Sequence, residues 1–205
     1  MKIDEDLVRR ARQGDRLAME TIWRECHGEV YRYAWWNSGS REDAEDITSE
    51  AFYRAFRNLD RYDPAKASFE TWIMRITRNL VIDARRREAR HPRGEMPKEA
   101  TAEGEVGEGL EADEERQALR EAMGELTEEQ RQVLVMKYVM DMKNRDIGTV
   151  LGRREGAVNA LHHRALRKLG RILEERGAGQ AGTPEGDREH GHREDSGSGR
   201  KERER

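Results

Sequence analysis

The stretch IGTVLGRREGAVNALHHRAL, Ile147–Leu166, combines a short apolar run, a glycine and a second helical pattern rich in arginine and histidine. Its spacing predicts a short helix from Lys143 to Leu151 and a second helix from Arg154 to about Leu173. Gly152, between the two, can adopt the left-handed conformation that a tight turn needs. Two helices joined in this way form the helix-turn-helix layout.

The second predicted helix has two different sides. Placed on a helical wheel, one side is apolar and we expect it to face the core: Val158, Leu161, Ala165 and Leu169. The opposite side has small residues near its start and hydrogen-bond donors farther along: Gly156, Asn159, Ala160, His163 and Arg167. Asn and Arg side chains can pair with base edges, and flanking arginines can hold phosphates. This segment alone fits a DNA-reading helix and an ordinary helical hairpin with a basic surface equally well.

The preceding part of the chain also predicts helices, because apolar residues recur at helical spacing and alternating β-branched runs are absent. We expect two opening helices that break near Gly14 and Asp15. Residues 41–59 form an amphipathic pattern, with Ser40 in place to cap its start. A further helix is expected over residues 69–90. The predicted fold class is therefore all-α.

A composition change divides the chain into two helical parts. Pro, Gly and Glu dominate residues 91–111, and this composition is typical of a flexible linker. Helical periodicity resumes near Leu119, and Thr127 with Gln130 matches a capping box. The last residues contain nothing that could anchor a core, so we expect them to be disordered. The predicted organisation is a helical domain over 1–91, a flexible acidic linker over 92–113, a helical domain over 114–176 and a disordered tail over 177–205.

Charge is segregated along the sequence. Residues 75–93 contain seven arginines against two acids, and residues 152–171 contain six basic residues against one acid. Between them, residues 95–115 contain nine acids and one lysine. Basic blocks attract phosphates and acidic blocks repel them, although any single block can be a solvated face. For any single block a solvated face is the better interpretation, and the segregation as a whole is a clue to function.

Two further patches predict partners. Residues 67–90 interleave aromatic and basic side chains, which unstacked bases require, whereas a core position is the default for aromatics at helical spacing such as Phe69 and Trp72. The helix predicted over 41–59 begins with a cluster of acids: Glu42, Asp43, Glu45, Asp46 and Glu50. The helix dipole explains carboxylates in a first turn, but five acids exceed what capping needs. This surplus indicates a protein partner with a basic face.

The sequence argues against several other classes of protein. The single cysteine, Cys26, allows neither an intramolecular disulfide nor a cysteine-rich zinc site. His27, His162 and His163 lack metal-ligand spacing, and there is no glycine-rich phosphate loop. We therefore expect no enzyme activity, no cofactor and no metal. The first residues lack a signal-peptide core and no apolar run reaches membrane-spanning length, so we expect a cytoplasmic protein without membrane insertion.

Three segments in this order resemble the sigma-70 family of bacterial RNA polymerase initiation factors, in its two-domain extracytoplasmic-function (ECF) group. They are REDAEDITSEAFYRAFRNLDRYDP, SFETWIMRITRNLVIDARRR and LTEEQRQVLVMKYVMDMKNRDIGTVLGRREGAVNALHHRALRKL. The resemblance implies that the first domain binds core RNA polymerase, at the clamp of the beta-prime subunit, and opens the minus-ten element. It implies that the second domain reads the minus-thirty-five element of promoter DNA.

The resemblance also assigns roles to individual residues. The acidic helix corresponds to the polymerase-binding helix, with Asp43, Glu45, Asp46, Glu50 and Phe52. The base-capturing loop and minus-ten helix correspond to Lys66, Ser68, Phe69, Thr71, Trp72, Arg75, Arg78, Asn79 and Asp83. The helix-turn-helix contributes minus-thirty-five contacts from Arg153, Arg154, Asn159, Ala160, His163, Arg164 and Arg167.

The second domain departs from the family pattern. Arg154 replaces the usual Ser or Thr at the start of the recognition helix, and Leu161 and His162 stand where Arg and Leu are common. The promoter sequence therefore does not carry over. Alternative functions are a helix-turn-helix regulator that acts without polymerase, and a helical adaptor whose basic faces bind acidic proteins. An anti-sigma factor is a further candidate partner.

Overall fold

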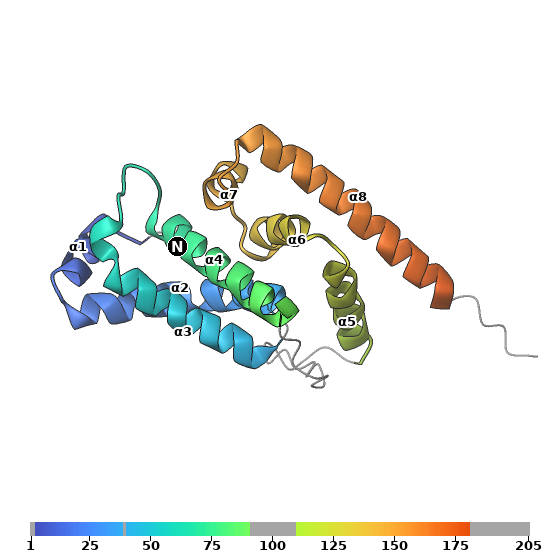
Figure 1. Ribbon diagram of the computed structural model, residues 1–205, viewed down its shortest axis with the longest axis horizontal. Coiled ribbons are helices and arrows are strands. Elements are labelled where there is room, and N and C mark those ends of the chain that lie inside the picture. The colour runs from blue at the N-terminus through green and yellow to red at the C-terminus, as the bar shows by residue number, and fades with distance from the viewer. Residues whose placement is uncertain (1–2, 39, 91–109, 181–205) are drawn as a thin grey trace, which may run out of the picture.

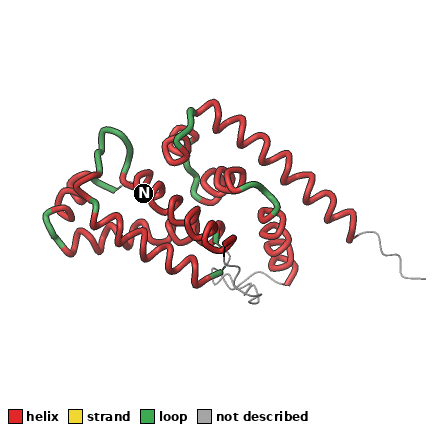
Figure 2. The backbone as a smooth tube through the Cα atoms, in the orientation of Figure 1, coloured by secondary structure: helices red, strands yellow, loops and turns green. Residues whose placement is uncertain are grey.

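The computed structural model describes residues 3–38, 40–90 and 110–180 (Figure 1), with side chains described up to Arg90 and from Gln117 to Arg176. Throughout these residues the secondary structure is helical, as predicted, and no strand is present in them. Figure 2 shows the helices joined by short loops. In the part of the chain that the structure describes, no helix is long and apolar enough to cross a membrane.

The first half contains α1 (Glu5–Arg12), α2 (Arg16–Asn37), α3 (Arg41–Arg57), the short 3-10 helix η1 (Leu59–Arg61) and α4 (Phe69–Arg90). The predicted break between the first two helices is confirmed, because Gly14 has a φ of 90° and Asp15 caps α2. Ser40 caps α3 by accepting a hydrogen bond from the backbone N–H of Asp43. Each cap satisfies backbone donors that a helix start would otherwise leave unpaired.

Helices α2, α3 and α4 pack around one apolar core. Tyr33, Phe69 and Ile73 are among its largest fully buried side chains. The aromatic rings of Tyr62, Phe69 and Trp72 lie within 5.7 Å of one another, centroid to centroid, where the loop after η1 meets α4. This cluster anchors the start of α4 and so fixes the direction in which that helix leaves the loop.

The second half contains α5 (Leu110–Gly124), α6 (Glu128–Leu134), the π-helical turn η2 (Val135–Val139), α7 (Asn144–Leu151) and α8 (Glu155–Gln180). The predicted capping box of Thr127 and Gln130 is present at the start of α6. Helix α5 begins before residue 114 and α8 continues beyond residue 176, so the helices extend past both ends of the predicted second domain. The remainder of the predicted linker and tail lies outside the described residues.

The two halves pack against each other. Helix α7 lies on α4, and η2 lies on α2 (Figure 1). Arg78 of α4 donates from Nε to Oε1 of Gln132 in α6, over 2.9 Å. The guanidinium of Arg120 in α5 lies 5.3 Å from the ring centroid of Trp35 in α2. Sequence periodicity identifies an apolar face on a helix but not which distant helix covers it, and so this packing was not anticipated.

Candidate nucleic-acid interface

The turn between α7 and α8 has the geometry predicted for a helix-turn-helix. Gly152 ends α7 with φ 65° and ψ 34°, in the left-handed region that glycine occupies without steric cost. The backbone N–H of Arg153 then donates to the carbonyl of Gly148 over 2.8 Å. A Cβ on Gly148 would lie 2.7 Å from the carbonyl oxygen of Arg153. The close approach of these two backbone segments sets the position of α8.

Helix α8 buries one side and exposes the other. Val158, Leu161 and Ala165 lie in the core, as the wheel predicted. All seven residues that the sequence assigned to minus-thirty-five contacts are exposed: Arg153, Arg154, Asn159, Ala160, His163, Arg164 and Arg167. Their exposure leaves donors along one surface of a helix, which is the arrangement that direct reading of a major groove requires.

Some of these side chains have partners on neighbouring helices. Nη2 of Arg153 lies 2.6 Å from Oε1 of Glu129 on α6, in an ion pair whose members are both about 44% exposed. Exposed pairs of this kind contribute little to stability. The pair with Glu129 therefore holds Arg153 only weakly.

Two contacts to the recognition helix had no signal in the sequence. The amide of Asn144, at the start of α7, donates from Nδ2 to Oδ1 of Asn159. The hydroxyl of Tyr138 in η2 lies 2.9 Å from Nε2 of His162. Burial, together with the nearby His163 and Lys137, lowers the pKa of His162. Helical spacing does not reveal pairs between elements, although the polar Asn144 beside a predicted base-reading helix is visible in the sequence.

Helix α4 presents only part of the predicted minus-ten set at its surface. Lys66, Arg75, Asn79 and Asp83 are exposed, and Trp72 and Arg78 are partly buried. Phe69 and Thr71 are instead core residues, with 1% and 3% of their surface exposed. The hydroxyl of Ser68 accepts from the backbone N–H of Thr71 and so caps the helix. Phe69 and Thr71 thus pack in the core in this structure, and their assignment to base contacts stays a prediction.

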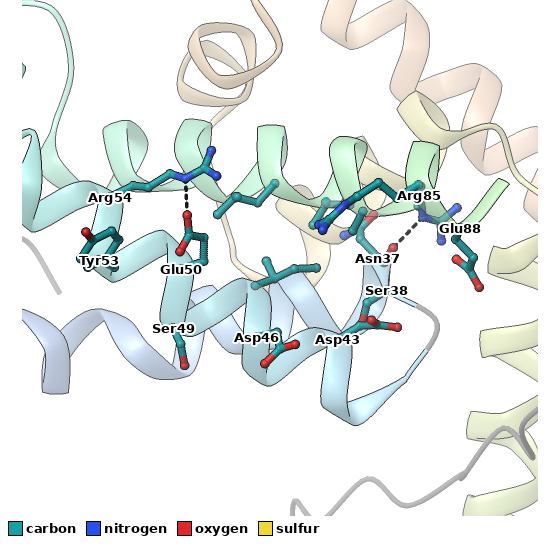
Figure 3. A pocket seen from close by; sticks show the side chains of 15 residues that line it. Asn37, Ser38, Asp43, Asp46, Ser49, Glu50, Tyr53, Arg54, Arg85 and Glu88 are labelled. Carbon is teal, nitrogen blue, oxygen red and sulfur yellow. Dashed lines mark hydrogen bonds and ion pairs between the residues drawn. The ribbon is translucent and has the colours of Figure 1, made fainter. Parts of the chain in front are cut away.

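A groove of about 790 Å³ separates α3 from α4 (Figure 3). Asp46 and Glu50 of α3 and Arg85 of α4 are among its lining residues, and Leu80 and Val81 lie buried beneath it. Glu50 pairs with Arg54 over 2.6 Å, as the dashed line in Figure 3 shows. The charged lining of the groove is mixed, with carboxylates on α3 that include Asp46 and Glu50, and arginines on both helices that include Arg54 and Arg85.

Among the residues predicted to bind polymerase, the carboxylates and the aromatic residue differ in how far they are buried. Glu45 and Asp46 are exposed, Asp43 and Glu50 are partly buried, and Asp43 accepts from the hydroxyl of Ser40 over 2.8 Å. Phe52 is 4% exposed and packs against Phe56 and His27, so it lies in the core, and its assignment to polymerase binding stays a prediction. In the described part of the chain no cluster of His, Cys, Asp and Glu could hold a metal ion.

Comparison with known proteins identifies the family. The model for sigma-70 region 2 matches residues 22–91, and the model for sigma-70, region 4 matches residues 116–169. The ECF RNA polymerase sigma factor SigW of Bacillus subtilis is 30% identical over 180 residues, which cover 81% of this chain and 96% of SigW. The chain therefore belongs to the sigma-70 family, in its ECF group.

Two other curated relatives are longer than the matched region. BldN of Streptomyces coelicolor is 31% identical over 82% of this chain and 65% of BldN. SigE of Mycolicibacterium smegmatis is 34% identical over 76% of this chain and 63% of SigE. The matched region thus spans less than two thirds of the length of these two relatives, both of which are ECF RNA polymerase sigma factors.

Solved structures share the fold. CnrH, in complex with the cytosolic domain of CnrY, aligns with a TM-score of 0.67 at 23% identity, over 85% of this chain and 99% of CnrH. The sigma factor RpoE, in complex with the anti-sigma factor NepR from Bartonella quintana, aligns with a TM-score of 0.63 at 18% identity, over 76% of this chain and 96% of RpoE. The arrangement of helices described above is therefore the arrangement of known sigma factors.

Proposed function

We propose that this chain binds core RNA polymerase and directs it to promoters by contacting DNA at two elements. The observation that carries the proposal is the division of α8, whose apolar side is buried while all seven predicted minus-thirty-five residues are exposed. Family membership supplies the partner, core polymerase. The chain contributes no chemistry of its own in this scheme, because polymerase makes the RNA.

The three surfaces, on α8, on α4 and at the α3–α4 groove, have different roles in this proposal. Helix α8 reads the minus-thirty-five element through Asn159, His163 and Arg167, and Arg153 and Arg154 hold the flanking phosphates. The exposed residues Arg75 and Asn79 of α4 act at the minus-ten element. The carboxylates of the α3–α4 groove bind the polymerase clamp. These tasks place the protein in the cytoplasm, where core polymerase and promoter DNA are.

The decisive experiment combines purified core RNA polymerase, this chain and a library of double-stranded DNA with randomised upstream sequences. We expect transcripts from a subset of templates that share two sequence elements, and none from the same templates with core polymerase alone. Binding to specific DNA in the absence of polymerase, with no transcription in its presence, would instead indicate a regulator that acts without polymerase.

Reversing one charge on α3 tests the polymerase-binding surface. Asp46→Lys replaces an exposed carboxylate at the groove with a cation. We expect affinity for core polymerase to fall by about tenfold or more, because like charges at an interface oppose association. Fluorescence anisotropy with labelled protein measures the affinity.

Glu20→Lys is the matched control. Glu20 is an exposed acid on α2 that pairs with Arg24 and does not line the groove. Its reversal makes the same change in net charge and should leave the affinity within about twofold of the unmodified chain. Equal losses in the two variants would show that net charge, and not the groove, governs binding.

An anti-sigma factor is part of the same proposal. Its support is the relationship to RpoE, which is known in complex with the anti-sigma factor NepR. Such a partner would have to cover surfaces that polymerase uses, since holding the factor inactive requires competition for the same sites. Its test is whether a candidate protein displaces this chain from core polymerase in a binding assay.

A further inference from the structure

Asn144 of α7 makes a side-chain contact with the recognition helix at a residue that we assign to base reading. Its Nδ2 donates to Oδ1 of Asn159, and Asn159 lies on the exposed side of α8. The contact joins residues fifteen positions apart, across the turn at Gly152. The first helix of the pair therefore constrains the orientation of an amide on the second.

The constraint decides which atoms Asn159 presents outward. An amide has one oxygen that accepts and one nitrogen that donates two hydrogens. Since Oδ1 of Asn159 already accepts from Asn144, the nitrogen with both hydrogens is the end left for DNA. A donor end fits the acceptors of a base edge, such as N7 and O6 of guanine or O4 of thymine, and not the amino group of cytosine.

Asn144 itself is held in a way that suits this role. Its Oδ1 is buried, and among the residues that the structure describes no donor reaches it. Asn144 is the first residue of α7, and the preceding residue, Lys143, makes no side-chain cap. The side chain thus does not act as a helix cap, and its only hydrogen bond among the described residues is the one to Asn159.

We propose that Asn144 is a positioning residue for promoter recognition, which sets Asn159 with its amide nitrogen outward and so selects a base with an acceptor edge. The inference rests on the proposed function of α8. Asn144 acts through Asn159, so substitutions of Asn144 change which base is preferred at one position of the upstream element.

Two substitutions of Asn144 test this role. Asn144→Ser is too short to reach Asn159 and is well tolerated at a helix start. This substitution frees the Asn159 amide to turn, and the preference at one position should weaken roughly 5- to 150-fold, the range that a good base contact provides. Asn144→Asp only accepts at neutral pH, so Asn159 must donate to it and turn its oxygen outward. The preferred base should then change toward cytosine, whose major-groove edge presents only an amino donor.

Thr149→Asp is the control for the added negative charge. Thr149 is exposed on the same helix, and its hydroxyl donates to the carbonyl of Arg145 within that helix. This variant should weaken use of all templates alike. Each variant is assayed as the full chain with core polymerase on the randomised DNA library, and its thermal unfolding is compared with that of the unmodified chain.

Three outcomes are distinguishable. A changed base preference in Asn144→Asp, with an unchanged preference in Thr149→Asp, supports the positioning role. A preference that is the same in the unmodified chain, Asn144→Ser and Asn144→Asp overturns it and leaves the proposed function intact. An unmodified chain that shows no template preference overturns the proposed function itself.

Discussion

His162 shows how one residue can make a local surface sensitive to pH. It stands where a leucine is common in the family, and its Nε2 lies 2.9 Å from the hydroxyl of Tyr138. Burial and the nearby positive groups lower its pKa below the ordinary 6.5. The folded chain therefore binds a proton at this site less readily than the unfolded chain does.

The sign of the pH effect follows from this difference. Well above pH 6.5 the residue is neutral in both states, and it makes no pH-dependent contribution. As the pH falls below 6.5 the unfolded chain takes up the proton first, so we expect stability to decrease. His162→Gln keeps a side chain that can pair with Tyr138 but does not titrate, and it should lose less stability between pH 7.5 and 5.5. Urea unfolding of both proteins at the two pH values measures the difference, and parallel losses would contradict the prediction.

The helix-turn-helix depends on backbone geometry at one residue between its elements. Gly152 has a φ of 65°, whereas Gly170 lies within α8, and a Cβ there would meet nothing within 4 Å. Alanine at Gly152 should destabilise the fold by about 1–2 kcal/mol, because a Cβ disfavours the left-handed conformation. Alanine at Gly170 should stabilise it by up to about 1 kcal/mol through helix propensity.

Thermal unfolding of the two glycine variants measures both effects. Opposite shifts of the midpoint are expected, downward for Gly152→Ala and upward for Gly170→Ala. The pair controls for the general effect of adding a methyl group. Two shifts of the same sign would show that the turn tolerates another conformation.

The helices and their ends were predictable because local chemistry determines them. Ser40 and Thr127 cap the helices that the sequence indicated, and Gly152 adopts the expected turn conformation. The apolar side of α8 followed from a 3.6-residue period alone. These features depend on residues a few positions apart, and that range is what a sequence pattern encodes.

Contacts between distant elements were not predictable in the same way. Phe52 and Phe69 match positions assigned to binding, but both are buried in the core. The family resemblance matches residues by their position in the sequence, and that position does not show whether a side chain is buried. Likewise, the hydrogen bond between Arg78 and Gln132 joins residues 54 positions apart. No periodicity in either helix specifies that pair.

At the scale of the whole molecule, the contact between the halves includes buried polar and charged side chains. Gln132 is fully buried, accepts from Arg78 and donates to Glu128 over 2.9 Å. Arg131 is 4% exposed, and burial is the main cause that lowers its pKa to about 10. Buried charged groups are expensive to desolvate and contribute little net stability. We therefore expect the halves to separate at modest cost, as contact with two separated promoter elements requires.

Gln132→Met tests that expectation. It keeps a similar volume but leaves Arg78, which is partly buried, without its acceptor across the contact between the halves. We expect a larger radius of gyration by small-angle X-ray scattering. Gln117→Met is the control, since Gln117 pairs with Glu121 within α5. Superimposable scattering from the unmodified chain and Gln132→Met would show that the packed arrangement does not depend on this bond.

The contact of Arg120 with Trp35 makes Trp35 an intrinsic fluorescent probe of the contact between the halves. All four tryptophans lie at or before position 72, and the cation over Trp35 comes from α5. When the halves separate, the indole loses this neighbouring charge and meets water, so its emission should change in wavelength and intensity. The separation can therefore be followed by stopped-flow fluorescence without any attached dye, while unlabelled DNA and polymerase are added.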